Sequence, residues 1–317
     1  MTIPDNQRVK RELLLRTLFP SMPAAAHVRL VELLEEVELE AGSIAFKVGD
    51  LPDHFLFLLE GRVALESESL RAIEFSGVSV VGVVDAILDR PRQRACRALE
   101  ASKALRIRSA DWFDLLEDNA EVARAGIRNF ASQLHRLWQE LSARLPRHSE
   151  PPPGIVPSAL STYDKILALR QASFLRRAGM QAIASLAAIA DTEVLQAGES
   201  LFEVGNGGED FFVVTTGLIQ LSNGSGLQFT HDAGDVVGGP AAFCNALPSY
   251  SATALTPSVV LRIPQQEFYD QAEEHGRLLR GTLAYLALEL EALQAATSVA
   301  LAGVTRESAE TPARRAE

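Results

Sequence analysis

The feature that most constrains the fold is an internal repeat with an offset of 156 residues. Four pairs of glycines share this offset: Gly42 and Gly198, Gly49 and Gly205, Gly61 and Gly217, and Gly82 and Gly238. Turns that need a positive φ prefer glycine, so a shared offset at four glycines indicates one framework of turns that is present twice without net insertion. The chain is therefore expected to contain two copies of one domain.

Each copy has a stretch of short, alternating apolar segments that are separated by turn residues. These stretches run from Val37 to Ile107 and from Val194 to Ile263, and helical patterns precede both. Several short strands with regular turn signals predict a β-sandwich or jelly roll. The predicted fold class is mainly β with flanking helices: two tandem β-jelly-roll domains, each ending in a long helix.

The two terminal helices are predicted from Trp112 to about Leu145 and from about Gln265 to Ala300. Each has a seam of apolar residues at alternating spacings of three and four, which is typical of a helix that packs along a second helix. The seams are Ile127, Phe130, Leu134, Leu137 and Leu141 in the first helix, and Leu279, Leu283, Leu286, Leu290 and Leu293 in the second. Trp138 lies beside the first seam and is predicted to be an exposed contact residue.

Changes in composition give the domain boundaries. The first domain is predicted over residues 8–148 and the second over 163–302. Between them, residues 149–162 form a proline-rich linker, because three consecutive prolines cannot continue a helix. The polar and charged residues 303–317 are predicted to form a disordered tail.

The composition favours a cytoplasmic protein without enzymatic activity. A net charge of −11 argues against a nucleic-acid-binding surface. The sequence has no apolar leader and no run of about 18 apolar residues, so no membrane span is expected. Cys96 and Cys244 lie in apolar surroundings and suggest no disulfide or metal site. The six histidines are scattered and no catalytic motif is present, so we expect no enzyme and no metal.

A candidate anion site lies between Val80 and Ile107. Gly82 ends an apolar run, and Arg92 follows ten residues later, before an alternating segment. A glycine lets backbone amides approach a phosphate closely, and a guanidinium binds its oxygens in a bidentate manner. A second interpretation is that Arg92 is one more charge on an exposed hairpin edge, in the run Arg90, Arg92, Arg94 and Arg97.

Each copy resembles a cyclic-nucleotide-binding domain of the kind found in catabolite-activator regulators, protein kinase A regulatory subunits and cyclic-nucleotide-gated channels. The resemblance rests on AGSIAFKVGD and DHFLFLLEGRVAL in the first copy, and on AGESLFEVGNGGEDFFVVTTGLIQLS in the second. It implies an eight-stranded jelly roll whose cassette, between two strands, holds the cyclic phosphate. It also implies a glutamate after the cassette glycine for the ribose hydroxyl, and an arginine for the phosphate.

The first cassette keeps part of this pattern. The resemblance places the ligand-binding positions at Gly82, Val83, Arg92, Arg94 and Ala95, with valine where the family has glutamate and alanine where it has Thr or Ser. Because the phosphate arginine is present, this copy is the candidate for binding a cyclic nucleotide, either cAMP or cGMP.

The second cassette is degenerate. Gly238 is followed by Gly239 in place of the glutamate. Unbroken register places Pro248 at the arginine position, whereas matching Ser251-Ala252-Thr253 to the family's Ser-Ala-Thr places Tyr250 there. Neither residue neutralises a phosphate, and an unpaired buried phosphate is costly. This copy is expected to have lost cAMP binding.

The favoured function is a regulatory or adaptor protein whose first domain binds a cyclic nucleotide. Two alternatives stay open: a ligand-free interaction or assembly scaffold, and a cyclic di-GMP effector in which Arg90, Arg92 and Arg94 bind a larger diphosphate. The catabolite-activator resemblance implies a DNA-binding helix-turn-helix, for which the residues after Ser298 leave no room. We therefore expect a protein partner and no DNA, with the long helices forming either a pseudo-dimer within the chain or a homodimer.

Overall fold

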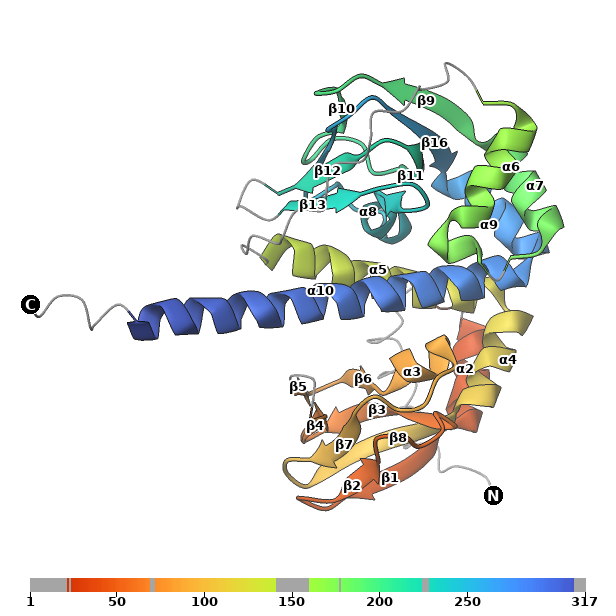
Figure 1. The fold of residues 1–317 in the computed structure, drawn as a ribbon. Coiled ribbons are helices and arrows are strands. Elements are labelled where there is room, and N and C mark those ends of the chain that lie inside the picture. The colour runs from red at the N-terminus through yellow and green to blue at the C-terminus, as the bar shows by residue number, and fades with distance from the viewer. Residues whose placement is uncertain are drawn as a thin grey trace, which may run out of the picture. The chain divides into compact units, whose positions relative to one another are not determined.

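The computed structural model describes residues 22, 24–68, 72–140, 160–176, 178–223 and 228–310, with side chains up to residue 293. The chain divides into two compact units, Met1–Asn129 and Phe130–Glu317, and each contains one β-sandwich (Figure 1). Part of the helical pattern predicted before Val37 and most of the proline-rich linker lie outside the described residues.

The first sandwich consists of two four-stranded antiparallel sheets with the strand orders β1-β8-β3-β6 and β2-β7-β4-β5. Its strands are β1 (Glu35–Leu39), β2 (Ile44–Phe46), β3 (His54–Glu60), β4 (Arg62–Glu66), β5 (Ile73–Ser76), β6 (Ser79–Val81), β7 (Ala95–Ala98) and β8 (Ser102–Arg108). In β7, Cys96 and Ala98 are buried while their neighbours are half-buried, as the two-residue period of a strand requires.

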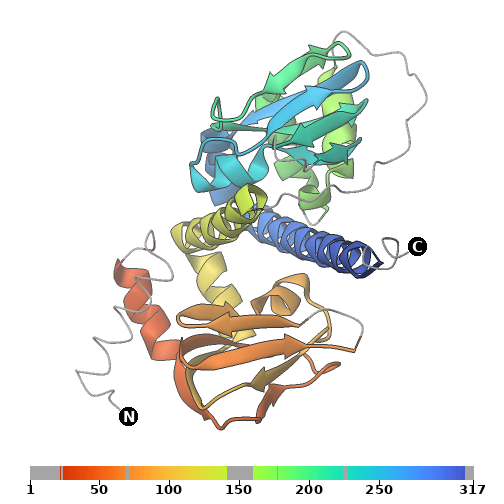
Figure 2. The same cartoon turned by 90° about the vertical axis from the view of Figure 1, so that its left-hand side faces the viewer.

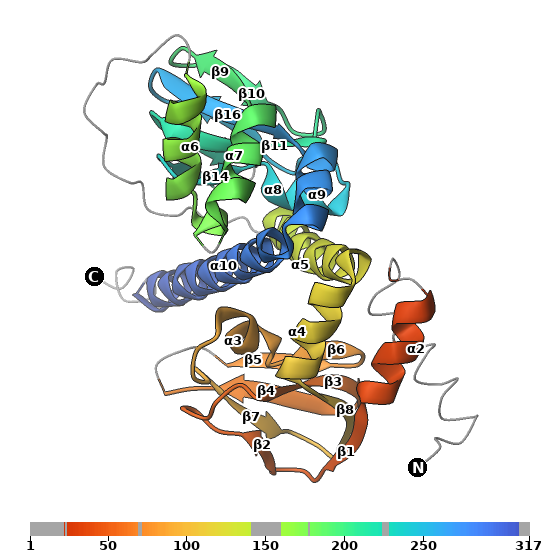
Figure 3. The same cartoon turned by 90° about the vertical axis from the view of Figure 1, so that its right-hand side faces the viewer.

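The helices that accompany this sandwich are α2 (Ala24–Leu33), α3 (Val83–Leu88), α4 (Ser109–Asp118) and the first part of α5 (Ala120–Glu140). Helices α2 and α4 lie side by side at one end of the sandwich (Figure 3). The Trp112 ring of α4 lies 5.7 Å from the Phe55 ring of β3, edge to face, so α4 is held by aromatic packing on the central strand.

The second sandwich repeats this topology, with the strand orders β9-β16-β11-β14 and β10-β15-β12-β13. Its strands are β9 (Asp191–Leu195), β10 (Ser200–Phe202), β11 (Asp210–Thr216), β12 (Ile219–Ser222), β13 (Gln228–His231), β14 (Val236–Val237), β15 (Ser251–Ala254) and β16 (Ser258–Pro264). The register shift between Leu58 and Glu60 recurs between Val214 and Thr216, at the same offset. The predicted duplication and the fold class are confirmed.

The second unit has more helix around its sheets. These elements are α6 (Thr162–Gln171), the 3₁₀ turn η1 (Ser173–Leu175), α7 (Met180–Ile189), α8 (Gly239–Cys244), α9 (Gln265–Glu274) and α10 (Gly276–Glu310). Phe174, Phe211 and Phe268 are buried and their ring centroids lie 5.4–6.1 Å apart. This aromatic cluster fixes η1 and α9 against β11. No helix of the described chain is long and apolar enough to cross a membrane.

Both predicted terminal helices are interrupted. Asn119 (φ −141°, ψ 97°) separates α4 from α5, and His275 (φ −131°, ψ 72°) separates α9 from α10. The prediction of one continuous helix in each copy is therefore wrong, and the Asn119 amide group ends α4 by donating to the Leu115 carbonyl at 3.3 Å. Helix α10 runs without a break from Gly276 to Glu310 (Figure 2). It therefore enters residues 303–317, for which the composition predicts disorder.

The boundary between the compact units also differs from the prediction. The second unit begins at Phe130, not after residue 148, so the C-terminal half of α5 belongs to it. Trp138, in this half of α5, is 6% exposed and lies against Phe229 and Tyr250 of the second unit, at 4.5 and 4.6 Å between ring centroids. The prediction that Trp138 is exposed is wrong, because its ring is part of the second domain's interior.

Candidate functional site

Gly82 brings two parts of the first cassette together. It follows β6, adopts φ +83° and leads into α3. A Cβ atom at this position would lie 2.7 Å from Phe46 Cζ and 3.0 Å from Arg92 Nη1. Only glycine combines this φ with such close approach, so the backbone at Gly82 contacts the Arg92 guanidinium directly.

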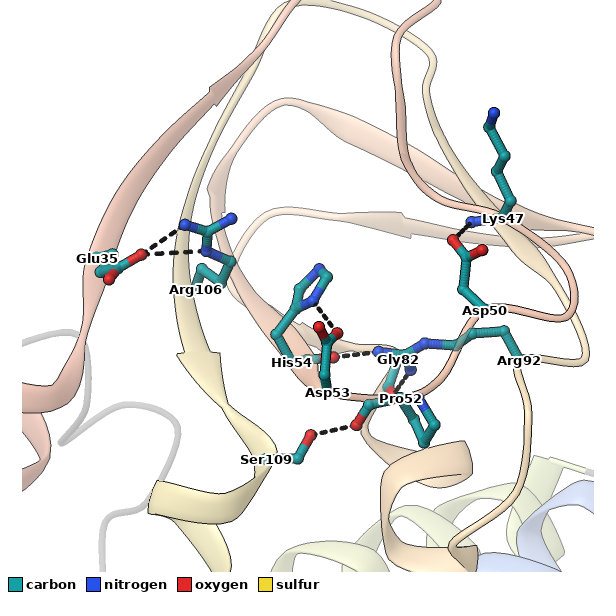
Figure 4. Close-up of polar contacts among 10 residues, drawn as sticks. All are labelled: Glu35, Lys47, Asp50, Pro52, Asp53, His54, Gly82, Arg92, Arg106 and Ser109. Carbon is teal, nitrogen blue, oxygen red and sulfur yellow. Dashed lines mark hydrogen bonds and ion pairs between the residues drawn. The ribbon is translucent and has the colours of Figure 1, made fainter.

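Arg92 is the central side chain of this cassette. It is 1% exposed, and its guanidinium lies 4.1 Å from the centroid of the Phe46 ring. Nη1 donates to the Gly82 carbonyl and Nη2 to the His54 carbonyl (Figure 4). The interpretation of Arg92 as a charge on an exposed hairpin edge is therefore wrong.

The carboxylates around Arg92 are engaged elsewhere. Asp50 accepts a hydrogen bond from the Lys47 backbone at 2.7 Å, and Asp53 lies 2.6 Å from the His54 ring nitrogen (Figure 4). Asp85 accepts from Arg90 Nε at 2.8 Å and from the Gln93 backbone at 3.2 Å, which holds the loop between α3 and β7.

Arg92 is therefore a buried cation without an ion-pair partner in the described part of the chain. Burial lowers its pKa, while Asp85 and Asp53 raise it from a distance. An arginine stays protonated under such conditions. Its Nε is buried and has no hydrogen-bond partner among the described residues. In the described part of the chain the guanidinium directly contacts two carbonyl dipoles and the Phe46 ring, and no carboxylate pairs with it.

The other predicted residues differ in what they offer a ligand. Val83 is 8% exposed in the first turn of α3 and has no acceptor for a hydroxyl. Ala95 lies at the start of β7 and likewise has no polar side chain. Arg94 is half-buried, and among the described residues its Nε has no partner. Arg90 is paired with Asp85 at 2.8 Å, which leaves Arg92 and Arg94 as the cations of this cassette.

Two contributors to the site were not identified from the sequence. The Phe46 ring and the His54 carbonyl both bind the Arg92 guanidinium. One sequence signal could have pointed to both residues: Phe46 lies in the segment AGSIAFKVGD and His54 in DHFLFLLEGRVAL, the two segments that carry the family resemblance in the first copy. A backbone carbonyl leaves no trace in residue identity, so His54 could not be assigned by its side chain.

The structure decides the register of the second cassette. The Gly205 N–H donates to the Pro248 carbonyl at 2.9 Å, as the Gly49 N–H does to the Arg92 carbonyl at 2.9 Å. Pro248 therefore stands at the arginine position, and Tyr250 stands at the position of Arg94. The alternative register, with Tyr250 in place of the arginine, is wrong.

Tyr250 is buried inside the second domain, next to the cassette glycine Gly238. It is 2% exposed, and its ring centroid lies 4.6 Å from that of Trp138 and 5.8 Å from that of Phe202. Its hydroxyl forms a hydrogen bond with the backbone of Gly238, and burial raises its pKa well above the ordinary value. Gly239, at the glutamate position, is buried at the start of α8. The Tyr250 hydroxyl thus already forms a hydrogen bond with the Gly238 backbone, which a bound phosphate would need as its own partner.

The two sandwiches define a class of protein: tandem antiparallel jelly rolls, each with a glycine-led turn into a short helix. In the first copy, the candidate anion-binding arginines lie in the loop between that helix and the next strand. The family model described as cyclic nucleotide-binding domain matches residues 36–119 and 192–275, which together are more than half of the chain. The chain belongs to the cyclic nucleotide-binding domain family, with both copies as members. Among the described residues, no group of three or more side chains could hold a metal ion.

Solved structures of protein kinase A regulatory chains are among those similar to the chain. The regulatory domain of Toxoplasma gondii PKA with cAMP is 15% identical, with 92% of this chain and 98% of that chain covered and a TM-score of 0.35. The regulatory subunit of a cAMP-independent protein kinase A from Trypanosoma cruzi, bound to guanosine, is 13% identical, with 88% of each chain covered and a TM-score of 0.35. No curated protein matches the chain.

Proposed function

We propose that the protein is a non-enzymatic regulatory protein whose first domain binds a cyclic nucleotide at the Arg92 cassette and whose output passes to a protein partner. The observation that carries this proposal is the charge of Arg92, which is buried without an ion-pair partner in the described part of the chain. Removing a cation from water is costly unless an anion accompanies it. A cyclic phosphate supplies that anion.

Arg94 gives the phosphate a second partner. It stands two residues beyond Arg92 in the loop before β7, and its buried Nε has no partner in the described part. The ribose is bound less well, because Val83 has no acceptor for the 2′-hydroxyl. A missing hydrogen bond to a buried polar group costs about 1–3 kcal/mol, so we expect roughly tenfold to hundredfold weaker binding than a complete cassette gives.

The second domain is expected to bind no nucleotide. Tyr250 already uses the Gly238 backbone, and Pro248 provides no cation. The proposed stoichiometry is therefore one nucleotide per chain, with cAMP and cGMP as the first candidates.

Calorimetric titration and thermal unfolding with cAMP, cGMP and cyclic di-GMP test the proposal. A ligand that binds only the folded state adds about 2.7 kcal/mol of stability at 100 times its Kd. Arg94→Ala is expected to weaken binding with little loss of stability, since the described structure gives this side chain no partner. Arg97→Ala is the matched control, because Arg97 pairs with Glu66 at the surface. Absence of binding by all three nucleotides contradicts the proposal.

A ligand-free scaffold is the second candidate function. It is favoured by the two hydrogen bonds of Arg92 to carbonyls of its own domain, which give the residue a structural role without any ligand. A cyclic di-GMP effector is less well supported, because Arg90 is paired with Asp85 and does not extend the arginine pair. In the titration, cyclic di-GMP binding that exceeds cAMP binding would favour this third function.

For the long helices we propose the pseudo-dimer within the chain. The seam of α10 is buried, with Leu279, Leu283, Leu286, Leu290 and Leu293 each at most 6% exposed. The C-terminal half of α5 belongs to the same compact unit as α10, and the two helices cross in Figures 2 and 3. A covered seam leaves little apolar surface for a second copy, so sedimentation equilibrium is expected to give a monomer. A concentration-dependent dimer would favour pairing between chains.

A further inference from the structure

The second domain contains a cavity of about 480 Å³ beside its cassette, which is within the usual size of small-molecule sites. Its lining includes Phe202 of β10, Asp210 of β11, Gly238 before α8, and Pro248 before β15. All of these belong to the second compact unit. The family's ligand is not suited to this cavity, since no free cation lines it.

The first domain shows what fits at the corresponding place. Each of these four lining residues has a counterpart 156 positions earlier: Phe46, His54, Gly82 and Arg92. In the first domain the Arg92 guanidinium lies over the Phe46 ring and donates to the carbonyls of His54 and Gly82. Because proline replaces the arginine at 248, the second domain lacks this side chain and a cavity is present instead.

The groups that would receive a guanidinium are retained. Phe202 supplies the aromatic face, and Gly238 has φ +84° where Gly82 has +83°, so the backbone takes the same turn. A Cβ atom on Gly238 would lie 3.2 Å from the Asp210 carbonyl oxygen, which places that carbonyl against the glycine. The second domain therefore keeps the ring and both carbonyl positions that hold Arg92 in the first.

The charge of the lining adds a second, independent argument. Glu193, Glu209 and Asp210 line the cavity together with one cation, Arg262, which lies 2.8 Å from Asp210 and 3.7 Å from Glu193. At the position of Glu193 the first domain has Val37, and at that of Asp210 it has His54. The second domain has no counterpart of Arg92, and the lining of its cavity is net negative. This charge favours binding of a cation and disfavours binding of a phosphate.

We propose that this cavity binds the guanidinium group of an external ligand, which takes the place that Arg92 occupies in the first domain. A guanidinium fits better than an ammonium, because it is planar, stacks on an aromatic face and presents donors to two carbonyls at once. The group is supplied either by a free small guanidino compound or by an arginine side chain of a partner protein. This proposal is independent of nucleotide binding in the first domain.

Titration calorimetry of the full chain with agmatine tests the proposal. Cadaverine, which has an ammonium in place of agmatine's guanidinium and the same total charge, is the ammonium control, and inorganic phosphate is the anion control. We expect saturable binding of agmatine and at least about tenfold weaker binding of cadaverine. The peptides Gly-Arg-Gly and Gly-Lys-Gly distinguish the sources. Binding of the arginine peptide well above agmatine assigns the site to a partner's side chain, and the reverse order assigns it to a small molecule.

Pro248→Arg is the decisive variant, because it restores the internal guanidinium. It is expected to abolish agmatine binding, while Pro248→Ala removes the proline without filling the cavity and keeps binding. Phe202→Leu removes only the aromatic face and should weaken agmatine binding several-fold. It provides the test of the proposal if Pro248→Arg does not fold. Arg97→Ala, at a surface position of the first domain, should leave agmatine binding unchanged. Lack of agmatine binding, or binding that survives in Pro248→Arg, overturns the proposal.

Discussion

The ring of Trp138, near the end of α5, lies 4.6 Å from the ring of Tyr250 at an interplanar angle of 41°. A helix that follows the first sandwich in sequence thus closes the cassette of the second. Asn223 reinforces the contact by donating to the Trp138 carbonyl at 3.1 Å. The part of the degenerate second cassette around Tyr250 is therefore packed interior, and the cavity lies at Pro248 beside it.

Trp138→Ala is expected to destabilise the second unit by about 3–5 kcal/mol, because it removes a large aromatic side chain that is 6% exposed. Urea unfolding followed by circular dichroism measures the change. Tyr163→Ala is the control: this side chain is 68% exposed and its removal should cost less than about 0.5 kcal/mol. Equal effects of the two substitutions would contradict the burial of Trp138.

Gly82→Ala is expected to destabilise the first domain more than Gly42→Ala does. Both glycines have φ +83°, so both substitutions incur the cost of a left-handed conformation, about 1–2 kcal/mol. At Gly42 nothing lies within 4 Å of the new Cβ, whereas at Gly82 it would lie 2.7 Å from Phe46 Cζ and 3.0 Å from Arg92 Nη1. The difference in the free energy of unfolding between the two variants gives the energetic cost of the close contacts of the new Cβ atom at position 82 with Phe46 and Arg92. If the two variants were equally stable, Gly82 would not be in contact with Arg92.

The turn framework could be predicted from the sequence because glycine is favoured where φ is positive. The shared offset predicts the duplication, and the short alternating apolar segments predict the fold class. The inward direction of Arg92 could not be predicted, since four arginines at near-alternate positions give no sign of which one faces the core. The helix breaks were missed for a related reason. Asn119 and His275 interrupt the backbone without disturbing the apolar spacing on either side. Trp138 was placed on the surface because its partners, Phe229 and Tyr250, lie about a hundred residues away in the chain.

Cys96 is expected to react with thiol reagents far more slowly than Cys244. Burial raises the pKa of the Cys96 thiol to about 11, and the residue is fully buried in β7, whereas Cys244 is half-buried. At pH 8 the raised pKa alone lowers the thiolate fraction about a hundredfold relative to an ordinary thiol. In the variant Cys244→Ser, Ellman's reagent should find no reactive thiol in the folded protein and one after denaturation. Prompt reaction of folded Cys244→Ser would show that the first sandwich opens at β7.

Glu289→Gln is expected to stabilise the second domain at neutral pH. Glu289 is half-buried on α10; burial raises its pKa, His231 opposes this effect and Asp235 adds to it. A raised pKa means that the folded state binds the proton more tightly than the unfolded chain does. The contribution of this group is therefore favourable below the unfolded pKa and is lost as the pH rises through the folded pKa. Glutamine imitates the protonated acid at every pH, so the variant should be more stable than the wild type at pH 7 and about equally stable near pH 4.

Urea unfolding at both pH values measures this difference in stability between the variant and the wild type. Glu203→Gln, at an exposed position of the same domain, should show no such pH-dependent gain, and a gain at pH 7 that persists unchanged at pH 4 would contradict the assignment to ionisation of Glu289.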